Sequence, residues 1–255
     1  MSSSRTIAVV NQKGGVGKTT TAVNLSAELG ISGRTLLLDM DPQANATSSL
    51  GVDWRSLQTS TYDAIMGASV LDDVILPDTQ PGLDLAPANR ALAGAQIELA
   101  GAVDYERCLS KCLAALCRPY ETIIIDCPPS LGVLTVNALA AATDVLIPVQ
   151  CEYLALEGLG QLLETLDLVR ERMNPRLRLL GVLLTMHNAR TSLSTQVVRE
   201  VQTHFPRVVL QSIIPRSVRL SESPSYGQPV RTYDPGSPGA RAYAELAKEV
   251  RRRFQ

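Results

Sequence analysis

A ten-residue segment near the start of the chain, residues 11–20 with the sequence NQKGGVGKTT, limits the possible folds more than any other feature. It lies between an apolar run at residues 7–10, typical of a buried strand, and an apolar-periodic segment at residues 19–29, typical of a helix. A glycine-rich turn from strand to helix leaves backbone N–H groups free at a helix N-terminus, where the helix dipole also favours an anion. The segment therefore predicts a phosphate-binding loop.

Two side chains of this loop match the other needs of a bound nucleoside triphosphate. Lys18 supplies a point charge for the β- and γ-phosphates, and the hydroxyl of Thr19 is a ligand for Mg²⁺. A glycine-rich turn without a ligand is the alternative, but strand, loop, Lys-Thr pair and helix follow one another in order. The predicted nucleotide-binding residues of the loop are Lys13, Gly14, Gly15, Val16, Gly17, Lys18, Thr19 and Thr20.

The loop departs from the usual phosphate-binding pattern at two positions. Gln12 stands where that pattern has its first glycine, and a second lysine, Lys13, directly precedes Gly14. This arrangement resembles the deviant Walker A loop of the ParA/MinD class of P-loop ATPases. The resemblance implies that Lys13 reaches across a dimer interface to the nucleotide of the partner subunit, and that Lys13 and Lys18 both act in catalysis on ATP.

A second strand, expected at residues 34–40, ends on acidic residues. Asp39 and Asp41 alternate, so their carboxylates should lie on opposite sides of the strand end. The segment from Asp39 to Thr47, DMDPQANAT, resembles switch I of ParA proteins, which implies that Asp41 orients the attacking water. We place Asp39 in the Mg²⁺ surroundings. An acidic turn or helix cap is the alternative for both residues.

Residues 120–126, YETIIID, form an apolar, β-branched run that ends in a carboxylate. Such a run is typical of a parallel strand that delivers Asp126 to the carboxyl edge of a sheet. That is the Walker B arrangement, in which Asp126 binds Mg²⁺ through water. The next segment, CPPSLGVLTVNAL, resembles switch II of the same family.

The C-terminal half supplies the remaining nucleotide contacts. A strand at residues 144–148 leads to Glu152, which contacts either the partner subunit or the ribose, or else begins the helix expected at residues 155–173. After a strand at residues 177–185 comes Asn188, whose amide could read an adenine edge, although the family tends to have Asp there. The strand at residues 208–214 precedes Pro215 and Arg216, which the resemblance implies as adenine contacts.

Charge is unevenly distributed along the chain. The formal net charge is −1, but residues 1–169 hold 9 Lys and Arg against 19 Asp and Glu, a net of −10, and residues 170–255 hold 15 against 6, a net of +9. Such asymmetry favours a polyanion-binding face, unless folding interleaves the two regions. Arg190 and Arg219 match positions that the family is implied to use for the DNA backbone. A surface ion pair is the alternative for each arginine.

Composition narrows the remaining choices. At 255 residues with 45% hydrophobic and 19% charged residues, the chain is expected to be one globular P-loop ATPase domain, residues 1–255, without a separate N-terminal helix-turn-helix domain. No signal peptide or apolar run of membrane-spanning length is present, so we expect a cytoplasmic protein. The resemblance implies that it associates with the nucleoid. Five cysteines without CxxC spacing indicate neither disulfides nor a metal centre. The helix at residues 238–254 is either docked, which we favour, or a membrane anchor.

Together these segments predict an α/β fold with a doubly wound, mostly parallel sheet flanked by helices on both faces. The resemblance covers residues 5 to about 233 through five motifs in the family's order. It implies an ATPase with low intrinsic turnover that uses ATP and Mg²⁺, forms a sandwich homodimer with ATP, and binds double-stranded DNA without sequence preference. A ParB/Spo0J-type partner would stimulate release. The alternatives are a MinD-like membrane-cycling ATPase, a metal-cluster assembly ATPase and a small-molecule kinase.

Overall fold

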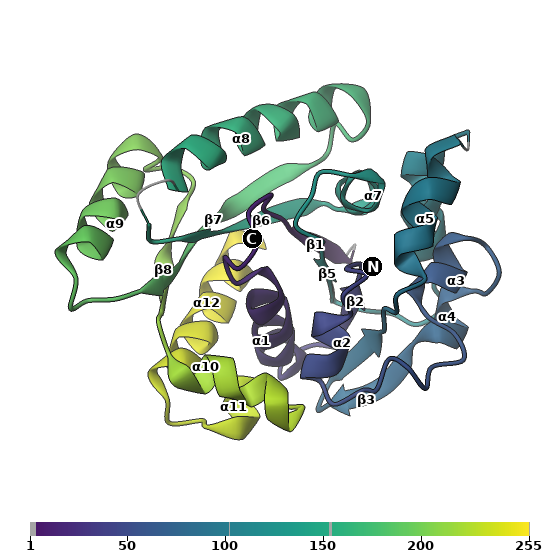
Figure 1. The fold of residues 1–255 in the computed structure, drawn as a ribbon, viewed down its shortest axis with the longest axis horizontal. Coiled ribbons are helices and arrows are strands. Elements are labelled where there is room, and N and C mark those ends of the chain that lie inside the picture. Colours follow the sequence, from purple (N-terminus) through teal and green to yellow (C-terminus); the bar gives the residue numbers. More distant parts are fainter. Residues whose placement is uncertain (1–3, 102, 153–154, 255) are drawn as a thin grey trace.

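The computed structural model describes residues 4–101, 103–152 and 155–254 (Figure 1). Its eight strands form one sheet in the order β3-β4-β2-β5-β1-β6-β7-β8. All neighbouring pairs are parallel except β3 with β4, which is antiparallel. The strands are β1 (Arg5–Val9), β2 (Thr35–Asp39), β3 (Leu76–Gln80), β4 (Leu83–Ala86), β5 (Thr122–Asp126), β6 (Asp144–Gln150), β7 (Arg178–His187) and β8 (Val209–Pro215).

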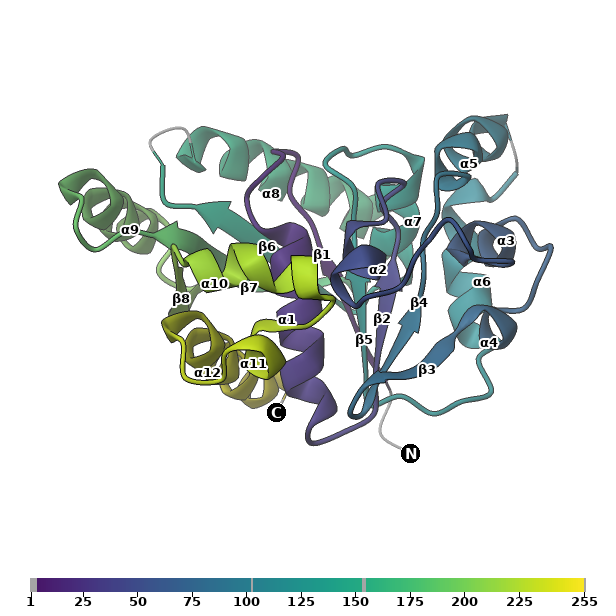
Figure 2. The same ribbon diagram turned by 60° about the horizontal axis from the view of Figure 1, so that its bottom comes forward.

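The central strands are apolar on both faces because helices cover both. In β2, Leu36 and Leu38 pack into one core and Leu37 into the other. One helical layer contains α3 (Thr61–Ile65), α4 (Leu71–Val74), α5 (Leu92–Glu98), α6 (Cys108–Ala114), α7 (Val133–Ala141), α8 (Ala155–Arg172) and α9 (Ser192–His204). The opposite layer contains α1 (Lys18–Gly30), α2 (Asn45–Ser49), α10 (Val218–Glu222), α11 (Val230–Tyr233) and α12 (Pro238–Phe254), as Figures 1 and 2 show. The predicted fold class is confirmed.

The register brings the acidic strand ends together. Asp126, the last residue of β5, lies beside Val9 of β1 on one side and beside Asp39 of β2 on the other. The loop that follows β1 leads into α1 at the same carboxyl edge. The sheet therefore gathers the predicted phosphate loop and both acidic segments at one place.

The structure differs from the expected elements where the sequence signal is weak. The apolar stripe of Leu109, Cys112, Leu113 and Leu116 predicts a helix over residues 104–116, but the structure has a 3-10 turn at Tyr105–Arg107 followed by the shorter α6. The edge strand β3 was not expected, because Pro77 interrupts its pattern, but an edge position tolerates the missing backbone donor. His187 follows the strand expected at residues 177–185 and is predicted to lie in a solvated loop. In the structure it ends β7, and its carbonyl accepts the backbone N–H of Arg216.

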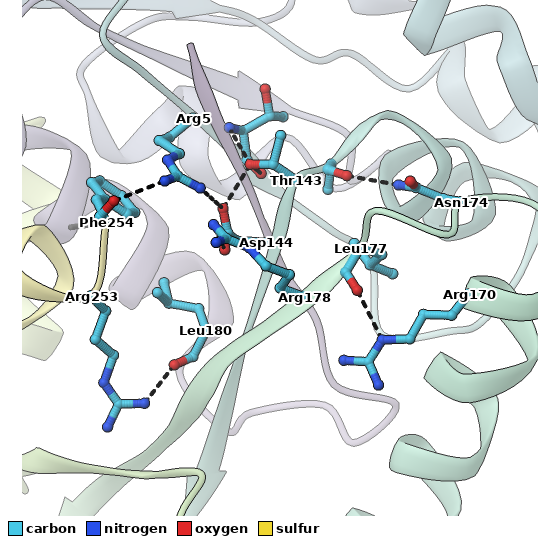
Figure 3. Close-up of polar contacts among 12 residues, drawn as sticks. Arg5, Thr143, Asp144, Arg170, Asn174, Leu177, Arg178, Leu180, Arg253 and Phe254 are labelled. Carbon is cyan, nitrogen blue, oxygen red and sulfur yellow. Dashed lines mark hydrogen bonds and ion pairs between the residues drawn. The ribbon is translucent and has the colours of Figure 1, made fainter. Parts of the chain in front are cut away.

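The C-terminal helix α12 is docked on the sheet, as predicted. Tyr243, Leu246 and Val250 are buried in the core that α12 shares with α1. At the end of the helix, Arg253 donates to the carbonyl of Leu180 at 2.7 Å and Arg5 donates to the carbonyl of Phe254 at 2.8 Å (Figure 3). The apolar stripe of α12 is thus used in packing. No helix of the described ranges has the length and apolarity to cross a bilayer.

Candidate functional site

The phosphate loop has the backbone that its glycines permit. Gly15 and Gly17 have φ of 72° and 90°, in the left-handed region, and Gly17 is the N-cap of α1. Val16 between them is buried, and its carbonyl accepts the hydroxyl of Thr185 at 2.8 Å. A side chain at the end of β7 therefore fixes the loop against the sheet, and strand, loop and helix follow one another as the sequence predicts.

Two cavities meet at this loop and share Gly17, Thr20 and Met186. The first has a volume of about 350 Å³ and is lined by predicted phosphate-site residues, including Gly14, Gly15, Lys18, Thr19, Asp41 and the switch II residue Pro129. The second has a volume of about 400 Å³ and is lined by Thr185, Pro215, Arg216, Ser217, Leu220 and Tyr243, among others. The two cavities share a wall and so form one cleft. The first cavity, with Lys18 and Asp41, is its charged half, and the second is a half that suits a nucleotide base.

Lys18 is almost completely buried at the bottom of the charged half. Its exposed fraction is 6%, and its ammonium donates to the carbonyl of Lys13 at 3.0 Å. Burial lowers the pKa of Lys18, although the nearby carboxylates of Asp126 and Asp41 oppose that shift. A buried cation bonded only to a carbonyl can exchange that partner for a phosphate oxygen, which is a stronger acceptor.

Asp126 is fully buried, and neither of its carboxylate oxygens has a hydrogen-bond partner among the described residues. Burial, and after it the negative charge of Asp39, raise the pKa of Asp126 well above its ordinary value. An unpartnered buried carboxylate is costly unless a cation or a proton satisfies it. With Thr19 lining the adjacent cavity, these residues fit Mg²⁺, which uses few protein ligands and completes its shell with water and phosphates.

Both carboxylate oxygens of Asp39, which the sequence places in the Mg²⁺ surroundings, accept hydrogen bonds within the chain. One oxygen accepts the backbone N–H and the hydroxyl of Thr47, at 2.9 and 2.8 Å, and the other accepts the N–H of Asp41 at 3.0 Å. Burial raises the pKa of Asp39 to about 6, while these bonds oppose the shift. These bonds hold α2 and Asp41 in place, and the predicted place of Asp39 in the Mg²⁺ surroundings stays a prediction. Asp41 itself lines the charged half of the cleft.

Lys13 and Glu152 meet at the open side of the loop. Their charged atoms are 3.3 Å apart, and the two side chains are 49% and 52% exposed. Gln150 donates to the other oxygen of Glu152 at 2.6 Å. Glu152 is not among the residues that line either half of the cleft, and its side chain contacts Lys13 and Gln150.

Asn188 also lines neither half of the cleft. Its side-chain oxygen accepts the N–H of Arg190 at 3.1 Å, and its own N–H donates to Ser194 at 3.1 Å. These bonds shape the turn that begins α9, so we do not propose Asn188 as a base contact. The sequence could not show this, because an Asn in a turn and an Asn on a base look alike.

The two predicted DNA-binding arginines lie in different elements of the C-terminal region. Arg190 is exposed in the turn before α9. Arg219, on α10, pairs with Glu222 at 2.9 Å and with Asp234 at 3.1 Å, and its side chain is 53% exposed. The surface ion pair, which was the alternative for each arginine, is therefore present at Arg219.

Sequence reasoning missed several residues that line the base half of the cleft, foremost Tyr243. It lies on α12, more than two hundred residues from the loop, and its hydroxyl hydrogen-bonds to the Thr21 hydroxyl of α1 at 3.1 Å. The stripe pattern of α12 identifies Tyr243 only as a core residue. Among the described residues no cluster of three or more His, Cys, Asp or Glu could hold a metal by itself, and the five cysteines are free thiols.

Known proteins share this geometry along nearly the whole chain. Residues 4–179 match the AAA domain family. The chain is 53% identical over 245 residues to the sporulation initiation inhibitor protein Soj of Bacillus subtilis, covering 96% of this chain and 97% of that protein. It is 48% identical over 249 residues to the chromosome partitioning protein ParA of Caulobacter vibrioides, covering 96% and 93%. The chain belongs to the Soj/ParA family of chromosome-partitioning ATPases.

A solved structure extends the comparison to the fold. It is described as cobyrinic acid a,c-diamide synthase from Mycobacterium smegmatis with a bound ATP analogue and magnesium. The two chains align with a TM-score of 0.87 and 40% identity, covering 99% of this chain and 96% of that one. The Soj/ParA resemblance that the sequence motifs indicate is thus confirmed, together with the ATPase class.

Proposed function

We propose that this ATPase switches between a monomer and a sandwich homodimer, that the dimer binds DNA, and that ATP hydrolysis releases it. The observation that carries the proposal is the charged half of the cleft, where Lys18 lies deep, together with the buried, unpartnered Asp126, whose charge acts on Lys18, and the half-exposed Lys13 at the open side of the loop. A deep cation and a carboxylate suit the triphosphate and its metal. Lys13, the lysine at the rim, can then act on the nucleotide of a second subunit.

Within one subunit, each side chain has a distinct part in hydrolysis. Lys18 binds the β- and γ-phosphates once it exchanges its bond to the carbonyl of Lys13. Asp41, fixed by Asp39 at its backbone N–H, orients water at the γ-phosphate. Thr19 and Asp126 would hold Mg²⁺, which when bound neutralises charge on the phosphates. Pro215 and Arg216 would pack against the base in the other half of the cleft.

The rim of the loop leaves room for a second copy. A side chain added at Gly14 would meet no atom within 4 Å in this chain, and Gly14 is exposed. Replacing it by Val should therefore leave the subunit intact and obstruct only a partner that approaches the loop. The half-exposed Lys13 beside it is the residue that we assign to the partner's nucleotide.

DNA binding is assigned to residues 170–255, whose net charge is +9. Arg190 is the exposed contact, and Arg219 becomes one when its acidic partners release it. Phosphate contacts of this kind carry no sequence information, so binding should be unspecific and should weaken steeply with salt. Two copies of the face in one dimer raise the avidity. A ParB/Spo0J-type protein would then accelerate hydrolysis and release, at the nucleoid.

The MinD-like alternative needs a C-terminal helix that is free to enter a membrane. Here the apolar stripe of α12 is buried against α1 and β8, and its end is tied by Arg5 and Arg253 (Figure 3). The observed docking therefore favours the partition cycle.

The test compares the wild-type protein with Lys13→Ala and Gly14→Val by analytical ultracentrifugation with a non-hydrolysable ATP analogue, followed by retention on plain plasmid DNA. The wild type should dimerise and bind DNA only with the analogue. Both variants should bind the analogue as monomers and fail to be retained. A wild type that stays monomeric when saturated with the analogue contradicts the proposal.

A further inference from the structure

Both lysines of the phosphate loop are engaged within their own subunit, and they form one connected chain of contacts. The ammonium of Lys18 donates to the backbone carbonyl of Lys13 at 3.0 Å. The ammonium of Lys13 in turn donates to Glu152 at 3.3 Å. The residue proposed to serve a partner is therefore held by a carboxylate of its own chain, 139 positions away in sequence.

The two ends of this contact are fixed to the same strand. Asn11 donates to the carbonyl of Pro148 on β6 at 2.7 Å, and its side-chain oxygen accepts the N–H of Lys13 at 2.9 Å. Glu152 follows β6, and Gln150 donates to one of its oxygens at 2.6 Å. The pairing of β1 with β6 thus sets the distance between lysine and carboxylate, so this pair is more constrained than two free surface side chains.

We propose that Glu152 is a positioning residue that retains Lys13 on its own subunit until a triphosphate is bound. Dimer formation then breaks one Lys13–Glu152 pair in each subunit, and the pair sets how much ATP-bound protein is needed before dimers form. This inference rests on the proposed dimer cycle and adds the restraint that acts before it.

A bound nucleotide loosens the Lys13–Glu152 pair by way of Lys18. Anionic phosphate oxygens accept stronger hydrogen bonds than a carbonyl does, so a triphosphate in the cleft draws the ammonium of Lys18 away from Lys13. The peptide that carries Lys13 then loses one of the bonds that hold it. An empty cleft leaves both contacts in place, which keeps Lys13 from reaching a neighbouring subunit without nucleotide.

Because the Lys13–Glu152 pair is exposed, it weakens dimer formation without preventing it. Both side chains are about half exposed, and ion pairs of this kind contribute little because water and salt screen them. Two such pairs break for each dimer that forms. Removing the negative charge at residue 152 should therefore tighten the dimer by about threefold to tenfold, within what two screened pairs can supply.

The experiment measures the dimer dissociation constant of the full-length protein, saturated with a non-hydrolysable ATP analogue, for the wild type and for Glu152→Gln. The variant should dimerise more tightly, and its advantage should shrink as the salt concentration rises, which a merely structural role would not produce. Gln150→Ala, which keeps the charge but removes the hydrogen bond that holds Glu152, should shift the constant in the same direction by less.

A matched control is Glu245→Gln on α12. It removes a pair with Lys248 of the same residue types, at 2.7 Å, in which both side chains are also well exposed. This control should leave the dimer constant unchanged. An unchanged or weaker dimer in Glu152→Gln overturns the restraint, the weaker one by showing that Glu152 serves the assembled dimer. A wild type that never dimerises overturns the proposed cycle instead, and the restraint with it.

Discussion

Buried carboxylates lie at both edges of the central sheet, and they differ in what surrounds them. At the amino edge, Asp144 accepts hydrogen bonds from Thr143 at 2.7 Å and from Arg178 at 2.8 Å, and pairs with Arg5 at 3.6 Å (Figure 3). At the carboxyl edge, Asp126 is equally buried and has no hydrogen-bond partner among the described residues. The same side chain is thus saturated by its own chain at one edge and left for a ligand at the other.

Asp84 sharpens the contrast. This fully buried residue of β4 accepts bonds from Arg34 at 3.0 and 3.2 Å, from the Tyr120 hydroxyl at 2.7 Å and from the N–H of Asp78 at 2.9 Å. Burial alone would raise the pKa of Asp84, but these bonds outweigh it and lower that pKa. Burial and the charge of Asp39 raise the pKa of Asp126, and the nearby Thr19 hydroxyl and Lys18 charge offset that rise only in part. Burial therefore does not identify a functional carboxylate, whereas unsatisfied hydrogen-bonding capacity does.

The largest effect should come from Asp126→Asn. The amide keeps the shape but cannot supply the charge that Mg²⁺ needs, so turnover with Mg²⁺ and ATP should fall by at least about 100-fold. Without nucleotide, the free energy of unfolding should rise by about 1 kcal/mol, because an unpaired buried charge is removed. Steady-state turnover and urea unfolding check both parts. Undiminished turnover, or a clear loss of stability, would place Asp126 with the structural carboxylates.

The opposite result is expected for Asp84→Asn, because Asp84 is a buried carboxylate whose oxygens accept hydrogen bonds from its own chain. Loss of the charge leaves Arg34 without its partner, and we expect unfolding to become easier by about 2–4 kcal/mol, less than for a fully buried pair because Arg34 is 46% exposed. ATP affinity should stay the same. As a control, Asp53→Asn removes an exposed pair with Arg55 and should change stability by under about 0.5 kcal/mol.

The pH dependence of Asp84 has a defined sign. Because its pKa is lowered on folding, its stabilising contribution is present above the unfolded value, near 4, and is lost as pH falls through the lower folded value. Urea unfolding of the wild type should show this loss below about pH 4. Asp84→Asn should lack that part of the acid sensitivity, and an identical pH profile would show that Asp84 does not titrate between these states.

A smaller effect is expected for Tyr243→Phe, which links the C-terminal helix to the cleft. It removes the hydrogen bond to Thr21 and should reduce stability by about 1 kcal/mol. Since Tyr243 also lines the base half of the cleft, ATP affinity should weaken by about twofold to fivefold, measured by isothermal titration. A stability loss without any change in affinity would separate α12 from the site.

The smallest effect should come from Asp234→Asn at the proposed DNA face. It removes one of the two carboxylates that hold Arg219, so DNA affinity with ATP should rise by about twofold to threefold. Arg190 has no such partner among the described residues, and Arg190→Ala should instead weaken binding and reduce the salt slope by about one. Fluorescence anisotropy with plain duplex DNA measures both. Weaker binding by Asp234→Asn would assign Arg219 a structural role.

The sequence predicted those parts of the molecule whose signal is local. The loop from Asn11 to Thr20, the apolar run that ends in Asp126 and the stripe of α12 each lie in one continuous segment, and the structure contains all three elements. The parallel order of the strands follows from their alternation with helices. The short edge strand β3 escaped prediction because its stability comes from pairing with β4.

The parts that could not be predicted depend on residues far apart in sequence. The contact of Lys13 with Glu152 joins the ends of β1 and β6, and the contact of Thr21 with Tyr243 joins the first and last helices. No spacing rule relates such pairs. The hydrogen bonds of Asp39 could not be predicted for a similar reason, since only the folded chain shows that Thr47 and the backbone of Asp41 donate to its oxygens.

The central claim is that Lys13 acts on the nucleotide of another subunit, and a mixing experiment tests it most directly. Lys18→Ala cannot hold ATP, but it also lacks the bond from Lys18 to the carbonyl of Lys13, so its Lys13 can serve a partner. Lys13→Ala holds ATP but lacks the lysine at the rim. Each variant alone should hydrolyse ATP at a negligible rate, and an equal mixture should recover clearly more turnover than the sum of the two. A mixture that stays as inactive as its components would contradict the account.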